Sequence, residues 1–94
     1  MSSPHSGAPW TVLSPVALRT LDWLPRKIAA AVVEFCTAVL PENPYRMTKP
    51  LRYELEGWHV ARRGDYRVLV QIIEEDHVLL IGRIEHRADV YRPH

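Results

Sequence analysis

Two stretches of this sequence gather side chains that could bind and process a phosphate group. Arg62 and Arg67 flank a Gly-Asp pair, and the C-terminal stretch "RIEHRADVYRPH" carries His86, Arg87 and Tyr91. Arginine offers a planar, permanently charged group that binds phosphate through two hydrogen bonds, and histidine can transfer protons near neutral pH. These residue types suit an anion site. A solvated polar terminus is the simpler alternative for the second stretch.

Three runs rich in β-branched and aromatic residues must position these side chains. They cover residues 58–63, 66–73 and 78–84, and they are joined by Gly64-Asp65 and by the acidic stretch 74–76. Such runs, separated by short turns, are typical of an antiparallel meander. The third strand then brings residues 86 and 87 toward the end of the sheet that holds the first turn.

A two-residue turn at Gly64-Asp65 pairs Arg62 with Arg67 on one face of the sheet. Two guanidinium groups directly across a ladder repel one another unless an anion lies between them, so the pair is a candidate phosphate clamp. The alternative is that each arginine extends to water or pairs with a carboxylate. We expect the helices to pack on the more uniformly apolar face of the strand, which carries Tyr66, Val68, Val70 and Ile72. The other face, which carries Arg67, Leu69, Gln71 and Ile73, is expected to stay open. The carboxylates considered as partners are Asp65, Glu85 and Asp89.

Two helices are predicted ahead of these strands. Ser14-Pro15 is a typical helix start, and the helix ends by Pro25. A second helix runs from Arg26, with an apolar stripe at Ile28, Val32, Phe35, Cys36, Val39 and Leu40. "PENP" (residues 41–44) stops it, and residues 45–57 are expected to be a loop. With a short strand at 10–13 joining the sheet edge, the layout is α+β, with two N-terminal helices packed on one face of a small twisted antiparallel sheet.

Composition narrows the class of protein. The 94 residues suit one domain, expected over 10–94 behind a disordered lead at 1–9, and a formal net charge of +1 means that any anion site is local. The single Cys36 excludes an internal disulfide and a Cys-rich zinc site. The remaining histidines lack metal-ligand spacing, so we expect no metal and no cofactor. With no signal-like start and no run of eighteen apolar residues, we expect a cytoplasmic protein without a membrane partner.

The run "LRYELEGWHVARRGDYRVLVQI" followed by "HRADVYR" resembles the RelE/ParE superfamily of toxins from type II toxin-antitoxin modules, and most closely its RelE-like branch. "LSPVALRTLDWLP" and "ENPYR" fit as well, so the similarity covers roughly residues 10–92. The resemblance implies a β-α-α-β-β-β fold. It also implies a metal-independent endoribonuclease that cleaves mRNA in the ribosomal A site, with a small RelB-like antitoxin as its partner.

The resemblance also implies roles for individual residues. In such an enzyme the 2'-hydroxyl attacks the adjacent phosphate, which calls for a base, an acid and cations around the phosphorus. Many relatives carry a basic or polar residue where this chain has Val60, so the proton-transfer role moves to His86. Tyr91 would orient the hydroxyl or stack on a base. Carried over position by position, the site residues are Arg62, Arg67, His86, Arg87 and Tyr91.

Two other functions stay open on the sequence. A ParE-like toxin inhibits DNA gyrase without catalysing a reaction, and an attenuated toxin retains only antitoxin binding. In each case an antitoxin is expected to cover the toxin with an amphipathic helix and an extended segment. Trp10, Trp23 or Trp58 would mark that surface if they are exposed, although tryptophan is more often a core residue.

Overall fold

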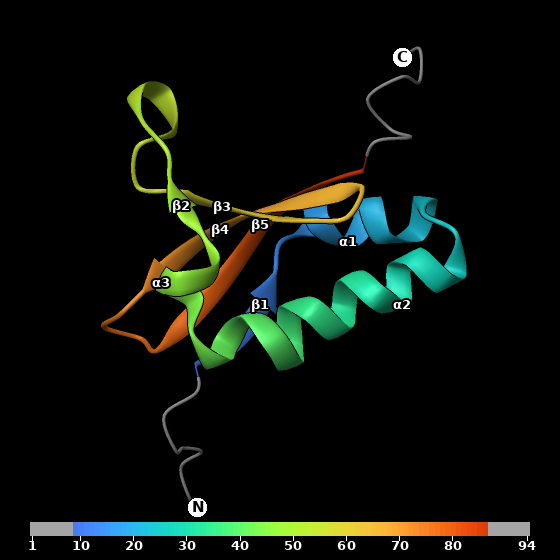
Figure 1. Cartoon of the computed structure of the whole chain (residues 1–94), viewed down its shortest axis with the longest axis horizontal. Helices are drawn as coiled ribbons and strands as arrows, with labels where there is room; N and C mark the ends of the chain where they lie inside the picture. The colour runs from blue at the N-terminus through green and yellow to red at the C-terminus, as the bar shows by residue number, and fades with distance from the viewer. Residues whose placement is uncertain (1–8, 87–94) are drawn as a thin grey trace, which may run out of the picture.

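The computed structural model describes residues 9–86, which form a five-stranded sheet with the order β1-β5-β4-β3-β2 and helices against one face (Figure 1). This confirms the predicted α+β class. Residues 1–8 of the expected disordered lead lie outside the described part of the chain. The elements are β1 (Trp10–Leu13), α1 (Pro15–Trp23), α2 (Arg26–Glu34), a π-helical turn (Phe35–Val39), a 3-10 turn (Leu40–Glu42), α3 (Pro44–Met47), β2 (Lys49–Pro50), a 3-10 turn (Tyr53–Leu55), β3 (His59–Arg63), β4 (Tyr66–Ile73) and β5 (Val78–His86).

The strands β3, β4 and β5 pair antiparallel, as the meander predicts, and β2, which was not predicted, pairs antiparallel with β3. The N-terminal strand β1 does join the sheet at an edge, where it pairs parallel with β5. The parallel pairing is possible because β1 and β5 are distant in sequence and need no tight turn between them. No helix of the described part is long and apolar enough to cross a membrane.

Both predicted helices begin at their predicted starts, and the first ends before Pro25, but the α-helical part of the second ends at Glu34 and tighter or wider helical turns continue to Glu42. Ser14 caps α1, its Oγ accepting a hydrogen bond from the backbone N of Ala17 at 3.1 Å, and the helix ends before Pro25. The second helix begins at Arg26 and passes into the π-helical turn. This wider turn holds Phe35 and Cys36, and both are buried.

The expectation that residues 45–57 form only a loop is wrong. This segment contains most of the four-residue helix α3, the two-residue strand β2 and a 3-10 turn at Tyr53–Leu55. Elements this short show no periodicity in sequence, and β2 exists only because its two residues pair with Val60 and His59 of β3. Proline at position 50 is tolerated because β2 is an edge strand.

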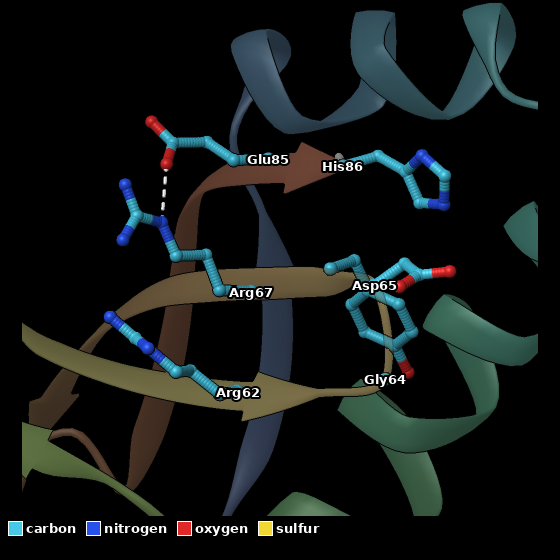
Figure 2. A pocket seen from close by; sticks show the side chains of 7 residues that line it. Arg62, Gly64, Asp65, Arg67, Glu85 and His86 are labelled. Atoms are coloured by element: carbon cyan, nitrogen blue, oxygen red, sulfur yellow. Dashed lines mark hydrogen bonds and ion pairs between the residues drawn. The ribbon is translucent and has the colours of Figure 1, made fainter. Parts of the chain in front are cut away.

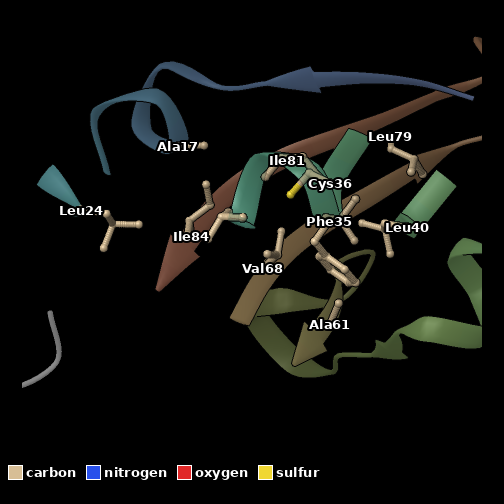
Figure 3. Close-up of a cluster of buried hydrophobic side chains, with 12 residues drawn as sticks. Ala17, Leu24, Phe35, Cys36, Leu40, Ala61, Val68, Leu79, Ile81 and Ile84 are labelled. Atoms are coloured by element: carbon tan, nitrogen blue, oxygen red, sulfur yellow. The ribbon is translucent and has the colours of Figure 1, made fainter. Parts of the chain in front are cut away.

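One hydrophobic core lies between the helices and the sheet (Figure 3). The prediction that the face with Val68 and Val70 takes the helices is confirmed, because both side chains are fully buried. The core residues are Ala17, Leu24, Val32, Phe35, Cys36, Leu40, Ala61, Val68, Val70, Leu79, Ile81 and Ile84.

A β-bulge in β5 decides which of its side chains face the core. Val70 pairs with Ile81 but Leu69 pairs with Arg83, so Gly82 is the extra residue. Because of this one-residue shift, Ile81 and Ile84 are both buried while Arg83 takes the opposite, open face.

Candidate functional site

The predicted arginine pair forms. Arg62 lies directly opposite Arg67 across a two-residue turn at Gly64 and Asp65, in which Gly64 has a φ of 59°, a left-handed conformation that suits glycine. Figure 2 shows both arginine side chains on the same side of the sheet, away from the helices. The neighbouring Arg63 lies on the helix-covered face, where its guanidinium sits 5.0 Å from the Phe35 ring centre.

A carboxylate on the neighbouring strand β5 lies in line with the two arginines. Glu85 lies directly opposite Arg67 in register, and the Arg67 Nε donates a hydrogen bond to Glu85 Oε1 at 2.6 Å (Figure 2). The second oxygen, Oε2, is 3.3 Å from the Nε of Arg83. Arg67 therefore pairs with a carboxylate, which is the alternative that the sequence analysis left open. Arg62 has no ion-pair partner within residues 9–86, so its positive charge remains available to an anion.

These side chains surround a pocket of about 350 Å³ at the end of the sheet that carries the β3–β4 turn. A cavity of this size admits a phosphate group together with part of a nucleotide. The lining residues are Arg62, Gly64, Asp65, Tyr66, Arg67, Glu85 and His86. The predicted pairing of Arg62 with Arg67 is confirmed, and their role in a functional site stays a prediction. Glu85, expected only as a possible ion-pair partner, also lines the pocket. Glu85 takes the open face only because of the bulge at Gly82, and this glycine is the signal in the sequence that could have found it.

His86 reaches the same pocket from the other face of the sheet. It pairs in register with Tyr66, its side chain is 9% exposed, and Figure 2 shows it pointing away from the two arginines. The position follows from strand alternation, because Glu85 takes the open face and the next residue must take the helix face. His86 and the two arginines therefore lie near the same end of the sheet but on opposite faces of it.

Arg87 and Tyr91, the two remaining predicted site residues, lie outside the described residues. Their predicted roles remain predictions. Because β5 ends at His86, beside the pocket, Arg87 follows directly in the chain from a residue that lines it.

Two titratable groups near the core, the Cys36 thiol and the Tyr66 hydroxyl, have a raised pKa. Burial raises the pKa of the Cys36 thiol to about 12. Burial, with a smaller contribution from Cys36, also raises the pKa of Tyr66, and nearby Arg63 opposes this effect. Tyr66 therefore presents a neutral hydroxyl at pH 7. Within residues 9–86, no group of three His, Cys, Asp or Glu side chains is placed to hold a metal ion.

The fold and the site define a small α+β protein with an arginine-lined pocket at one end of an open sheet face. Comparison with known proteins narrows this class. The family described as "ParE toxin of type II toxin-antitoxin system, parDE" matches residues 12–91, which is most of the chain. The protein belongs to this family of toxins.

The individual relatives agree with the family assignment. Toxin RelG of Mycobacterium tuberculosis is 49% identical over 85 residues, which cover 89% of this chain and 98% of the relative. Toxin RelE of the same organism is 48% identical over 93 residues, covering 98% and 93% of the two chains. The recognised resemblance to RelE-like toxins is therefore confirmed.

Solved structures share the fold. A chain of the M. tuberculosis toxin-antitoxin complex RelBE2 matches with a TM-score of 0.83 and 45% identity, covering 87% of this chain and 94% of that one. A chain of the intact Escherichia coli RelBE complex matches with a TM-score of 0.67 at 21% identity, over 84% and 96% of the two chains, and supports the fold alone. The protein is thus a type II toxin with a RelE-like architecture.

Proposed function

We propose that this toxin is a metal-independent endoribonuclease that cleaves mRNA on the ribosome. The observation that carries the proposal is the direct pairing of Arg62 with Arg67 on the open face, beside a pocket large enough for a nucleotide phosphate. Two adjacent guanidinium groups repel one another, and Glu85 offsets only part of this cost because it pairs with Arg67 and not with Arg62. A phosphate bound beside Arg62 would offset the rest. A toxin that acted only by binding another protein would have no need for this arrangement.

The chemistry assigned to the site is intramolecular attack by a ribose 2'-hydroxyl on the adjacent phosphate. Arg62, Arg67 and Arg87 would stabilise the negative charge that builds on the phosphorus oxygens. Arginine does not itself take up a proton, because its pKa exceeds 12. We assign proton transfer to His86, which lines the pocket from the helix face, and orientation of the hydroxyl or base stacking to Tyr91.

A small RelB-like antitoxin is the inferred partner, since two of the matching structures are RelBE toxin-antitoxin complexes. Exposed tryptophans on this chain offer it apolar anchors. Trp10 on β1 is 63% exposed and Trp23 at the end of α1 is 65% exposed, whereas Trp58 is partly buried and is not such an anchor. A cytoplasmic location follows from action on ribosomes.

Inducible expression of single variants tests the catalytic assignment. Arg62→Ala and Arg67→Ala each remove a cation from the charged transition state, and loss of one such group typically lowers the rate by about 10²–10³-fold. We expect growth arrest to disappear in both, and also in Arg87→Ala and Tyr91→Ala, with loss of new mRNA 5' ends. Arg19→Ala, on the exposed surface of α1, is the matched control with the same change of charge and full expected toxicity.

The same cultures separate the alternatives. Codon-positioned mRNA cuts that depend on the site arginines support the nuclease. Intact mRNA together with inhibited DNA supercoiling would instead support the gyrase-inhibitor function suggested by the name of the matching family. Normal growth of the wild type, with stable binding to its antitoxin, would indicate an attenuated toxin.

A further inference from the structure

Glu85 holds two arginines at once and uses the same part of each. Its Oε1 accepts from the Nε of Arg67 at 2.6 Å, and its Oε2 lies 3.3 Å from the Nε of Arg83. Both arginines are largely exposed, with side-chain exposures of 47% and 63%, while Glu85 is less exposed at 26%. The carboxylate therefore lies beneath and between the two guanidinium groups.

Within the described part of the chain, Glu85 approaches both arginines through Nε, which leaves their terminal nitrogens available. A guanidinium group has five N–H donors, and a bond through Nε occupies only one of them. The edge formed by the two terminal nitrogens suits bidentate phosphate binding, and no residue between 9 and 86 occupies it in Arg67 or in Arg83. A carboxylate bound to that terminal edge would have blocked a phosphate. Bound at Nε, it fixes the orientation of each arginine.

We propose that Glu85 is a positioning residue that joins Arg67 and Arg83 into a two-arginine phosphate clamp, and that Arg83 is a further phosphate-contacting residue. The proposal rests on the nuclease function above and deepens it. Arg83 lies two residues before Glu85 on β5, about 6.6 Å further from the strand end. Arg67 and Arg83 would together hold the reacting phosphate, and Arg62, directly opposite Arg67, would be a third cation beside it.

The fold supplies a specific device for this arrangement. With unbroken alternation from the buried Leu79 and Ile81, Arg83 and Glu85 would point into the core. The bulge at Gly82 shifts the register by one residue, so both side chains reach the open face beside Arg67.

Binding of inorganic phosphate tests the clamp without relying on cleavage. The chain is labelled with ¹⁵N-arginine, and the Nε–H signals are followed by NMR while phosphate is added to the wild type and to Glu85→Gln, Arg83→Lys and Arg83→Ala. We expect at least tenfold weaker phosphate binding in Glu85→Gln and Arg83→Ala. In the wild type, the Arg67 Nε–H signal should keep its hydrogen-bonded shift at saturating phosphate, because phosphate binds the other edge of the group.

Arg83→Lys separates the effect of the positive charge from the effect of the guanidinium geometry. Lysine keeps the charge, but its ammonium group cannot bind Glu85 and phosphate through separate edges. It should bind phosphate almost as weakly as Arg83→Ala. Glu75→Gln, in the exposed β4–β5 turn, is the charge-matched control and should bind like the wild type. Equal or tighter phosphate binding by Glu85→Gln would mean that the carboxylate only competes with phosphate. That result, or no binding by the wild type, overturns the proposal.

Single-turnover cleavage of mRNA on programmed ribosomes supplies the second readout. A positioning role predicts that Glu85→Gln lowers the maximal rate at saturating toxin by tenfold or more, with little change in the half-saturating concentration. If the wild type binds phosphate through the clamp but cuts no mRNA, the nuclease function fails while the clamp stands. If the wild type cuts mRNA and Glu85→Gln cuts it equally fast, the clamp fails while the nuclease function stands.

Discussion

Replacement of Gly82 by alanine tests the contact on which the geometry of β5 depends. A Cβ added at Gly82 would lie 2.3 Å from one carbon of the Trp58 ring and 2.4 Å from another, where ordinary contact begins at 3.4 Å. The ring must therefore retreat by about 1 Å or leave the surface, and overpacking of this kind costs about 1–3 kcal/mol.

The surface area that Trp58 would expose to water gives a similar free-energy cost. A buried tryptophan removes 150–250 Å² from water, and Trp58 is only partly buried, so about 100 Å² is at stake. At roughly 25 cal/mol per Å², displacement of the ring costs about 2.5 kcal/mol. We therefore expect Gly82→Ala to lower the free energy of unfolding by about 2 kcal/mol.

Urea unfolding followed by circular dichroism measures this loss. Trp58 emission is followed in a chain that also carries Trp10→Phe and Trp23→Phe, which remove the two exposed tryptophans. The emission of Trp58 should shift to the red in Gly82→Ala, because the ring moves into water. Phosphate binding should weaken in the same variant if the displaced ring disturbs Arg83, the neighbour of Gly82 on β5.

A double-mutant cycle identifies the cause. In a Trp58→Ala background, Gly82→Ala meets no ring, and its cost should fall below about 0.5 kcal/mol. A cost of about 2 kcal/mol in both backgrounds would refute the reasoning, because the loss would then arise from the backbone of the bulge and not from the contact with Trp58.

Two further predictions concern the core and the first helix. Burial holds the pKa of Cys36 at about 12, above its ordinary value of 9.0, so the unfolded chain ionises first as pH rises. The contribution of Cys36 to stability should be constant below about pH 9 and fall by up to about 1.4 kcal/mol per pH unit between pH 9 and 12. Urea titrations should find the slope of stability against pH reduced by this contribution in Cys36→Ala. Ser14→Ala removes both the helix cap on Ala17 and the bond that Ser14 Oγ donates to the Gly82 carbonyl at 2.8 Å, and should cost about 1–2 kcal/mol in urea unfolding. Thr20→Ala, which loses only an exposed bond within α1, is the control and should cost less than about 0.5 kcal/mol; an equal loss in both variants would contradict the capping argument.

Local signals were sufficient for most of the fold. Proline and serine fixed the ends of the first helix, and the Gly64-Asp65 turn determined the register of β3 with β4. Both signals act within a few residues, so they can be recognised without knowledge of the rest of the chain. The strand at Lys49–Pro50 could not be predicted, because only its pairing with β3 defines it.

In the site, too, features set by nearby residues could be predicted and features set by distant contacts could not. Arg62 and Arg67 were placed opposite one another correctly because a short turn connects them. The side chains of β5 depend on the bulge, and the sequence signal for it is a single glycine whose partner, Trp58, lies more than twenty residues away. The face taken by His86, opposite to that of the arginines, was therefore not foreseen.

The bulge links stability to function in this toxin. Gly82 has no side chain, so the Trp58 ring can lie against it, while its carbonyl accepts the Ser14 hydroxyl at the start of α1. These two contacts, one on the open face and one toward the helix layer, hold the backbone at the point where the register shifts. Because Arg83 and Glu85 follow within three residues, the orientation of the proposed clamp depends on contacts that touch no substrate. Variants that loosen the bulge should therefore lose phosphate binding together with stability, whereas Glu85→Gln should lose phosphate binding alone.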